Sequence, residues 1–155
     1  MNEKLRVQVL CGALAIAALA LARPSSGAGC TVTSSGVAFG SYSVFATSPT
    51  NTTGTISYSC TLPVNPPLIA LDRGSSATFY PRTLTGTYSS LQYNLYLDAA
   101  CTTVWGDGSS GTSTYQAGAP ASGQNYSATV YGRIPARQNA QAGAYSDSIV
   151  ITISF

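Results

Sequence analysis

The residues of this chain that could do chemistry are few, because it contains four cysteines but no histidine. Without histidine there is no imidazole base, no Ser-His-Asp triad and no histidine-bound metal. The cysteines form neither a CxxC pair nor a four-ligand set, so the sequence offers no zinc site. Only 8 % of the residues are charged, which leaves no basic footprint for nucleic acid. We therefore expect no metal, no cofactor and no nucleic-acid partner.

The remaining candidates for acid–base chemistry are four isolated aspartates, Asp72, Asp98, Asp107 and Asp147. No motif surrounds any of them, so we interpret them as turn residues and members of surface ion pairs. Asp107 lies between two glycines, as in a turn, whereas a calcium loop needs several oxygen ligands at fixed spacing. Arg133 is a candidate ion-pair partner for one of these carboxylates. The sequence thus predicts a protein that is not an enzyme.

The first 28 residues have the three parts of a secretory signal peptide. Lys4 and Arg6 supply positive charge, residues 7–22 are apolar, and small residues follow up to Ala28. The apolar run is shorter than the roughly 20 residues that a membrane-spanning helix needs. We predict cleavage after Ala28, with Ala22 as a second candidate site. The expected mature chain is a single domain, residues 29–155, which passes through the periplasm to the cell surface without a membrane span.

Three cysteines remain in the expected mature chain, and export brings them into oxidising conditions where a pair should form a disulfide. Cys30 opens the domain and Cys60 ends a strand-like run, so a bridge between them would join the first strand to the second. We predict the disulfide Cys30–Cys60. Cys101 is the odd cysteine, either a free thiol or a partner in a bond between chains.

Short alternating apolar runs, separated by Gly, Pro, Ser and Asn, follow one another along the mature chain. Alternation with period two, rich in β-branched and aromatic residues, predicts β-strands, and no segment has the apolar spacing of a helix. The chain is therefore expected to be all-β and to form a single sandwich. The runs lie at 37–39, 54–60, 68–71, 91–98, 128–131 and 148–155, and the patches 106–114 and 116–124 are expected to be loops. The last run places Ile149, Ile151, Ile153 and Phe155 on one face.

A series of short segments spans nearly all of residues 30–155. They are 30–32, 36–42, 54–60, 91–98, 104–108 and 130–135, followed by Gln138, Gly143 and 145–148. In order and content these segments together resemble the spore coat protein U domain family, which includes subunits of archaic chaperone–usher pili. The resemblance implies an immunoglobulin-like, pilin-type β-sandwich that lacks its last strand and is completed by a strand from a neighbour, known as donor-strand complementation.

The function that this resemblance implies is a secreted structural subunit of a pilus or spore coat, acting in cell adhesion. Its implied partners are a periplasmic chaperone, an outer-membrane usher and other subunits. Ile149, Ile151, Ile153 and Phe155 are the residues expected to pair with the chaperone or the donor strand. In the expected mature chain only Gly29 precedes Cys30. We therefore expect a subunit that accepts a strand without donating one, which favours a tip or terminal position.

The alternative is a standalone secreted β-sandwich that acts as an adhesion or carbohydrate-binding module. In that case the tyrosines and Trp105 would contact sugar or an abiotic surface. Tyrosine is also a good strand former and a common half-buried residue of sandwiches, which is the simpler interpretation of most of the ten. The two functions differ in one observable property, because a standalone module should be a stable monomer when it is made alone.

Overall fold

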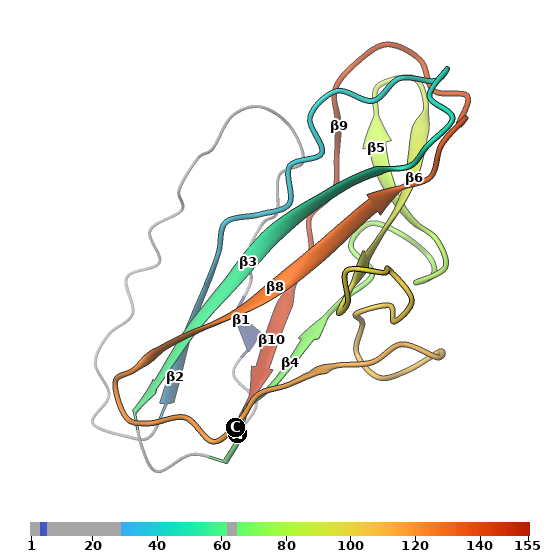
Figure 1. Cartoon of the computed structure of the whole chain (residues 1–155). Helices are drawn as coiled ribbons and strands as arrows, with labels where there is room; N and C mark the ends of the chain where they lie inside the picture. Colours follow the sequence, from blue (N-terminus) through green and yellow to red (C-terminus); the bar gives the residue numbers. More distant parts are fainter. Residues whose placement is uncertain (1–3, 6–28, 62–64) are drawn as a thin grey trace.

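Two antiparallel β-sheets lie against each other in the described part of the chain (Figure 1). The computed structural model describes residues 4–5, 29–61 and 65–155. One sheet has six strands in the order β2-β3-β8-β6-β5-β9, and the other has four in the order β1-β10-β4-β7. The strands are β1 (Lys4–Leu5), β2 (Gly29–Ser34), β3 (Thr50–Thr61), β4 (Leu68–Leu71), β5 (Arg82–Gly86), β6 (Ser90–Tyr96), β7 (Tyr115–Gln116), β8 (Asn125–Ile134), β9 (Tyr145–Ser146) and β10 (Ile151–Ser154).

The fold class predicted from the alternating runs is confirmed, because the described residues form strands and no helix. The runs 54–60, 68–71, 91–98 and 128–131 fall within or largely within β3, β4, β6 and β8. Buried and exposed residues alternate along β3 and β8, which pair from Thr50↔Ile134 to Ser59↔Asn125. Their inward side chains, with those of β4 and β10, form one hydrophobic core around Trp105.

The run at 37–39 was wrongly expected to be a strand. Val37 and Phe39 are buried, but their segment crosses the inner face of β3 and β8 without joining a ladder. Two glycines make room for this crossing. A Cβ on Gly54 would collide with the Gly36 carbonyl, and one on Gly132 would lie 2.7 Å from Val37 and 2.8 Å from Phe39. The segment therefore packs its apolar side chains into the core without being a strand. Alternation of apolar residues alone does not distinguish such a segment from a strand.

The predicted signal peptide lies mostly outside the described residues, which exclude 1–3 and 6–28. Ala28, after which cleavage is expected, also lies outside the described residues, so the cleavage site stays a prediction. Lys4 and Leu5 are described, and they form the short strand β1 beside β10. Within the described ranges, no helix has the length and apolar character needed to cross a bilayer.

Candidate functional site

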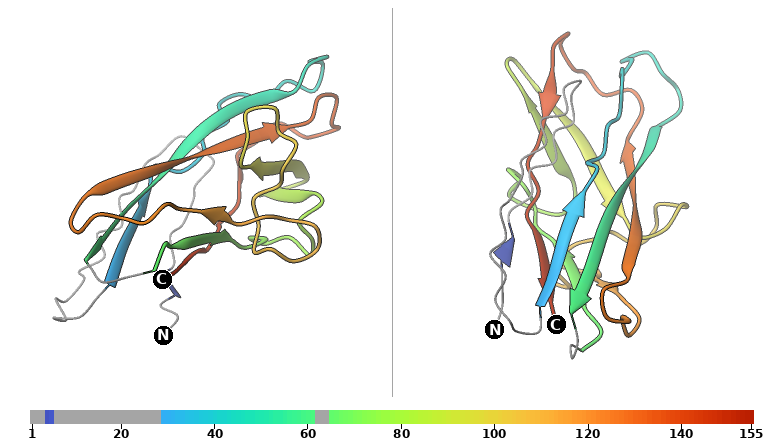
Figure 2. Two further views of the ribbon diagram at one scale, coloured as in Figure 1. Left: turned by 60° about the horizontal axis from the view of Figure 1, so that its bottom comes forward. Right: turned by 90° about the vertical axis from the view of Figure 1, so that its left-hand side faces the viewer.

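One long side of β10 is paired along only part of its length by the residues that the structure describes. On its inner side β10 pairs with β4 from Ile151↔Leu71 to Ser154↔Leu68. On its other side, among residues 4–5, 29–61 and 65–155, it pairs with β1 alone, through Lys4↔Thr152 and Leu5↔Ile151. Both β1 residues belong to the predicted signal peptide, so their removal would leave this edge open. The neighbouring edge of the six-stranded sheet is β2, and the right-hand view of Figure 2 shows β10 in red between β1 and β2.

The hydrogen bonds to β4 determine which residues of β10 face the open edge. The Asp72 N–H donates to the Val150 carbonyl (3.1 Å), which continues the β4–β10 register by one pair. Main-chain groups in an antiparallel ladder point alternately to one neighbour and then the other. Residues 150, 152 and 154 thus bond toward β4, and Ile149, Ile151 and Ile153 direct their N–H and C=O groups to the open edge.

The same three isoleucines turn their side chains into the core, where each is at most 2 % exposed. Under the open edge lies a small apolar recess of about 10 Å³, walled by both sheets. Its walls are formed by Ser34, Val37, Ile56, Leu71, Leu95, Val130, Ile149 and Ile151. The recess is no larger than one water needs, so the sandwich is nearly closed here. A strand added at this edge could form main-chain hydrogen bonds to β10 without any rearrangement. Burial of its inward side chains would require the two sheets to move apart.

The structure brings Ile149, Ile151 and Ile153 together at one edge and leaves Phe155 just past the end of β10. Phe155 is half-buried and packs against the core. The strand itself is shorter than the run 148–155, because side chains replace ladder partners at its start. The Val150 N–H donates to Asp72 Oδ1 (2.9 Å), and the Ser148 N–H donates to Asp147 Oδ1 (2.9 Å). Pairing of these residues with a chaperone or donor stays a prediction.

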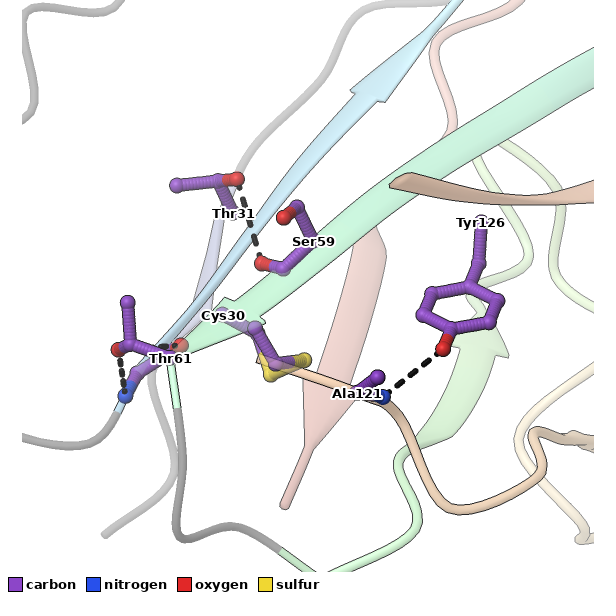
Figure 3. The surroundings of a disulfide bond; sticks show 8 residues. Cys30, Thr31, Ser59, Thr61, Ala121 and Tyr126 are labelled. Carbon is purple, nitrogen blue, oxygen red and sulfur yellow. Dashed lines mark hydrogen bonds between the residues drawn. A yellow bond between two sulfur atoms is a disulfide. The ribbon is translucent and has the colours of Figure 1, made fainter. Parts of the chain in front are cut away.

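Cys30 and Cys60 form a disulfide, the pairing expected from the sequence. They face each other directly in the β2–β3 register, and Figure 3 shows the bridge at the end of the sandwich where β2 begins. Side chains tie the surrounding strands as well. Thr31 Oγ1 donates to the Ser59 carbonyl (3.4 Å), and the Ala121 N–H donates to the Tyr126 hydroxyl (2.8 Å). The disulfide therefore holds β2, the edge strand opposite β10, onto the sheet.

We expect Cys30→Ser to lower the free energy of unfolding by about 2–5 kcal/mol, because the bond closes a loop of 30 residues. Denaturant unfolding of the oxidised protein measures the loss. Cys101→Ser is the matched control and should change stability little, since Cys101 is a free thiol. Peptide mapping without reductant that finds Cys60 linked to Cys101 would contradict the pairing.

Cys101 lies in a turn that begins at Asp98. Its N–H donates to the Asp98 carbonyl (3.0 Å), and its backbone has a positive φ of 58°. Burial raises the pKa of the Cys101 thiol. A raised pKa disfavours the reactive thiolate at neutral pH. The protonated thiol is therefore the favoured form of the odd cysteine in this conformation.

Two of the aspartates are turn residues, as interpreted from the sequence. The Thr103 N–H donates to Asp98 Oδ2 (2.7 Å) and lowers the pKa of that carboxyl, with Thr102 adding to the effect. The Ser109 hydroxyl donates to Asp107 Oδ1 (2.6 Å) and lowers the pKa of Asp107. In the described residues, no group of three or more His, Cys, Asp or Glu side chains lies close enough to hold a metal ion.

The other two aspartates do not form the surface ion pairs expected. Asp147 is 6 % exposed, and four donors meet its carboxylate. Asp72 Oδ1 accepts from the N–H groups of Gly74 and Val150, each at 2.9 Å. Arg133 donates to Asn51 Oδ1 (2.9 Å) and not to a carboxylate. No local pattern predicts these contacts, because Val150, Ser75 and Tyr93 are each more than fifty residues from the aspartate that they bond.

Arg82 is the least expected residue of the core, because its side chain is 0 % exposed. Its guanidinium donates to the Asp72 carbonyl (2.8 Å), Asn94 Oδ1 (2.6 Å) and the Trp105 carbonyl (2.7 Å). It also lies 5.0 Å from the centre of the Phe79 ring. Burial lowers the pKa of Arg82, while Tyr93 and Asp72 act in the opposite direction. Sequence reasoning missed this cluster, and the polar Asn94 within a strand-like run was its only sign.

Trp105 cannot contact a ligand in this conformation. Its side chain is 0 % exposed, its indole N–H donates to the Ile69 carbonyl (2.9 Å), and its ring stacks on Tyr115. Trp105 therefore does not support the carbohydrate-binding alternative. Exposed aromatic rings remain at Phe45 and Tyr88, which are on the loop before β3 and on the turn between β5 and β6.

Comparison with known proteins agrees with this architecture. A model of the Spore Coat Protein U domain matches residues 16–152. Protein U of Myxococcus xanthus is 34 % identical over 111 residues, which are 66 % of this chain and 59 % of Protein U. This chain therefore spans less than two thirds of that relative.

A similar fold occurs in the CsuC–CsuE chaperone–tip adhesion subunit pre-assembly complex from archaic chaperone–usher Csu pili of Acinetobacter baumannii. The likeness has a TM-score of 0.57 with 16 % sequence identity, and it covers 83 % of this chain and 40 % of the chain in that complex. At this identity the likeness concerns the fold, which is an immunoglobulin-like pilin sandwich.

Proposed function

The chain belongs to the Spore Coat Protein U domain family, and on this basis we propose that it is an exported structural subunit of a pilus or coat. In this proposal a periplasmic chaperone holds the subunit, an outer-membrane usher receives it, and a strand from another subunit completes its sandwich. The observation that carries the proposal is the incomplete pairing of β10, whose outer edge meets, of the residues described, just Lys4 and Leu5. A terminal position in the assembly remains part of the proposal.

Three features of the edge support strand addition. The edge already pairs with a short extended segment, β1, so its geometry suits a strand. The residues that direct main-chain groups outward are isoleucines with buried side chains. An incoming strand can therefore hydrogen-bond to the main chain of β10 and also pack its own side chains beside these isoleucines. An apolar strand left open in this way is an aggregation hazard in a finished monomer, and an incoming strand removes it.

We expect Ile153→Asp to abolish assembly, because a carboxylate would replace a side chain that is 2 % exposed at the edge. Thr152→Asp is the matched control, since Thr152 is the next residue of β10 and half-buried on the opposite face. The measurement is the apparent mass of the tagged chain in material sheared from its host's surface. The unsubstituted and Thr152→Asp chains should be found in large assemblies, and Ile153→Asp should be missing.

A different result would favour the alternative function. If the unsubstituted chain is released only as a free, folded monomer, it is a standalone secreted module and the pilus or coat proposal is wrong. Phe45 and Tyr88, which are 88 % and 75 % exposed, would then be the first aromatic residues to test for contact with a surface.

A further inference from the structure

Two carboxylates accept main-chain N–H groups just before β10 begins, those of Ser148 and Val150. The Asp72 carboxylate accepts the Val150 N–H (2.9 Å), and the Asp72 N–H donates to the Val150 carbonyl (3.1 Å). The Asp147 carboxylate accepts the Ser148 N–H (2.9 Å), both donors of Ser75, and the Tyr93 hydroxyl (2.7 Å). We call these two side chains the Asp72–Asp147 clamp.

Arg82 explains why a carboxylate is needed at this point. In a regular antiparallel pair, the Val150 N–H would donate to the Asp72 carbonyl. That carbonyl already accepts from Arg82, through Nε (3.1 Å) and Nη2 (2.8 Å). The Asp72 side chain supplies the missing acceptor. The buried guanidinium and the start of β10 are therefore joined through one residue.

We propose that the Asp72–Asp147 clamp sets the register in which β10 presents its open edge to an incoming strand. This inference rests on the proposed function. Both the inward side chains and the outward main-chain groups of β10 repeat every two residues. A slip of one residue against β4 would therefore present Val150, Thr152 and Ser154 in place of Ile149, Ile151 and Ile153. Burial of the three isoleucines opposes such a slip, and because the ladder to β4 is only four residues long, the clamp at its start adds a second constraint.

Asp72 and Asp147 thus act as positioning residues, since they do not themselves lie in β10. The side chain of Tyr93 extends the clamp into the core, because its hydroxyl donates to Asp147 Oδ2 and its ring is 2 % exposed. Asp107 makes a useful contrast. Its carboxylate also accepts main-chain and hydroxyl donors, but all of them belong to its own turn.

The test measures which face of β10 residue 152 occupies, because a slip of one residue against β4 exchanges the two faces. The full-length chain is exported from a Gram-negative host with a C-terminal Gly/Ser linker and a strand of alternating valine and threonine. In a Cys101→Ser background, Thr152→Cys is combined with a single cysteine at each successive threonine of the added strand. When Asp72 and Asp147 are unchanged, one cysteine position of the added strand should cross-link to residue 152 at least about tenfold more than the neighbouring positions. A tenfold ratio corresponds to a register preference of about 1.4 kcal/mol. Asp72→Ala should lose most of this cross-link, because a slip of one residue turns residue 152 inward, away from the threonines of the added strand.

Matched variants separate register from stability. Asp107→Ala should keep a single cross-linked position, and Asp72→Asn should restore one, because its amide oxygen can still accept the Val150 N–H. If Asp72→Ala yields no folded protein, Tyr93→Phe serves in its place, since it removes one hydroxyl donor from Asp147. A single unchanged position in every folded variant would overturn the clamp while leaving the proposed function intact. An unsubstituted chain that cross-links at no position would overturn both.

Discussion

A strand fused to the mature chain is expected to raise its thermal stability strongly. In this experiment residues 29–155 are compared with and without a C-terminally linked strand of alternating apolar residues. Burying about four apolar side chains contributes roughly 6–12 kcal/mol at full burial, and a whole domain is stable by only about 5–15 kcal/mol. Since the recess under the edge is about 10 Å³, the sheets must part to admit these side chains. The expected gain therefore lies toward the lower end of the range.

Thermal unfolding measures the effect, because each kcal/mol moves the melting temperature of a domain this size by about 3–6 °C. Without the strand, the mature chain is expected to unfold at low temperature or to aggregate through its open edge. A linked strand with aspartate at its inward positions is the control and should give no gain. A mature chain that melts cooperatively as a monomer, at a temperature unchanged by the linked strand, would mean that the sandwich is already complete.

Of the substitutions within the sandwich, we expect replacement of the buried Arg82 to lower the free energy of unfolding most. Arg82→Met fills similar space but leaves the Asp72 carbonyl, Asn94 Oδ1 and the Trp105 carbonyl without this donor. Asn94 Oδ1 still accepts the Leu95 N–H (3.0 Å), so the two carbonyls are the acceptors at risk. Each buried acceptor left unsatisfied costs about 1–3 kcal/mol, so the expected loss is roughly 2–6 kcal/mol in the free energy of unfolding. That is a large share of a domain's stability.

Denaturant unfolding in the presence of the linked strand measures this loss against two controls. Arg82→Lys should be intermediate, because a single ammonium cannot reach three acceptors in the fixed geometry of a guanidinium. Arg133→Met should cost about 0.5 kcal/mol or less, since Arg133 is partly exposed and bonds to Asn51. A loss below 1 kcal/mol for Arg82→Met would contradict the role given to Arg82.

The all-β fold class was predictable from the sequence because strand periodicity is a local property. The alternating runs that became β3, β6 and β8 each contain their own signal, in the spacing of apolar residues within a few positions. The Cys30–Cys60 pairing was also within reach, since the two cysteines flank consecutive strands. The family resemblance added the expectation of an open sandwich, and the incompletely paired outer edge of β10 is the feature of this structure that agrees with it.

The tertiary structure alone decided the positions of Arg82, Asp72 and Asp147. Nothing near Arg82 in the sequence predicts its burial, because its acceptors come from residues 72, 94 and 105, which only the packed sheets bring together. The same holds for Asp147, whose donors Ser75 and Tyr93 are more than fifty residues away. The position of Val37 in the core also depends on a distant residue, because Val37 occupies the space left by the missing side chain of Gly54. Hydrogen bonds and close packing join residues distant in the chain, whereas alternation records only which face of its own strand a residue occupies.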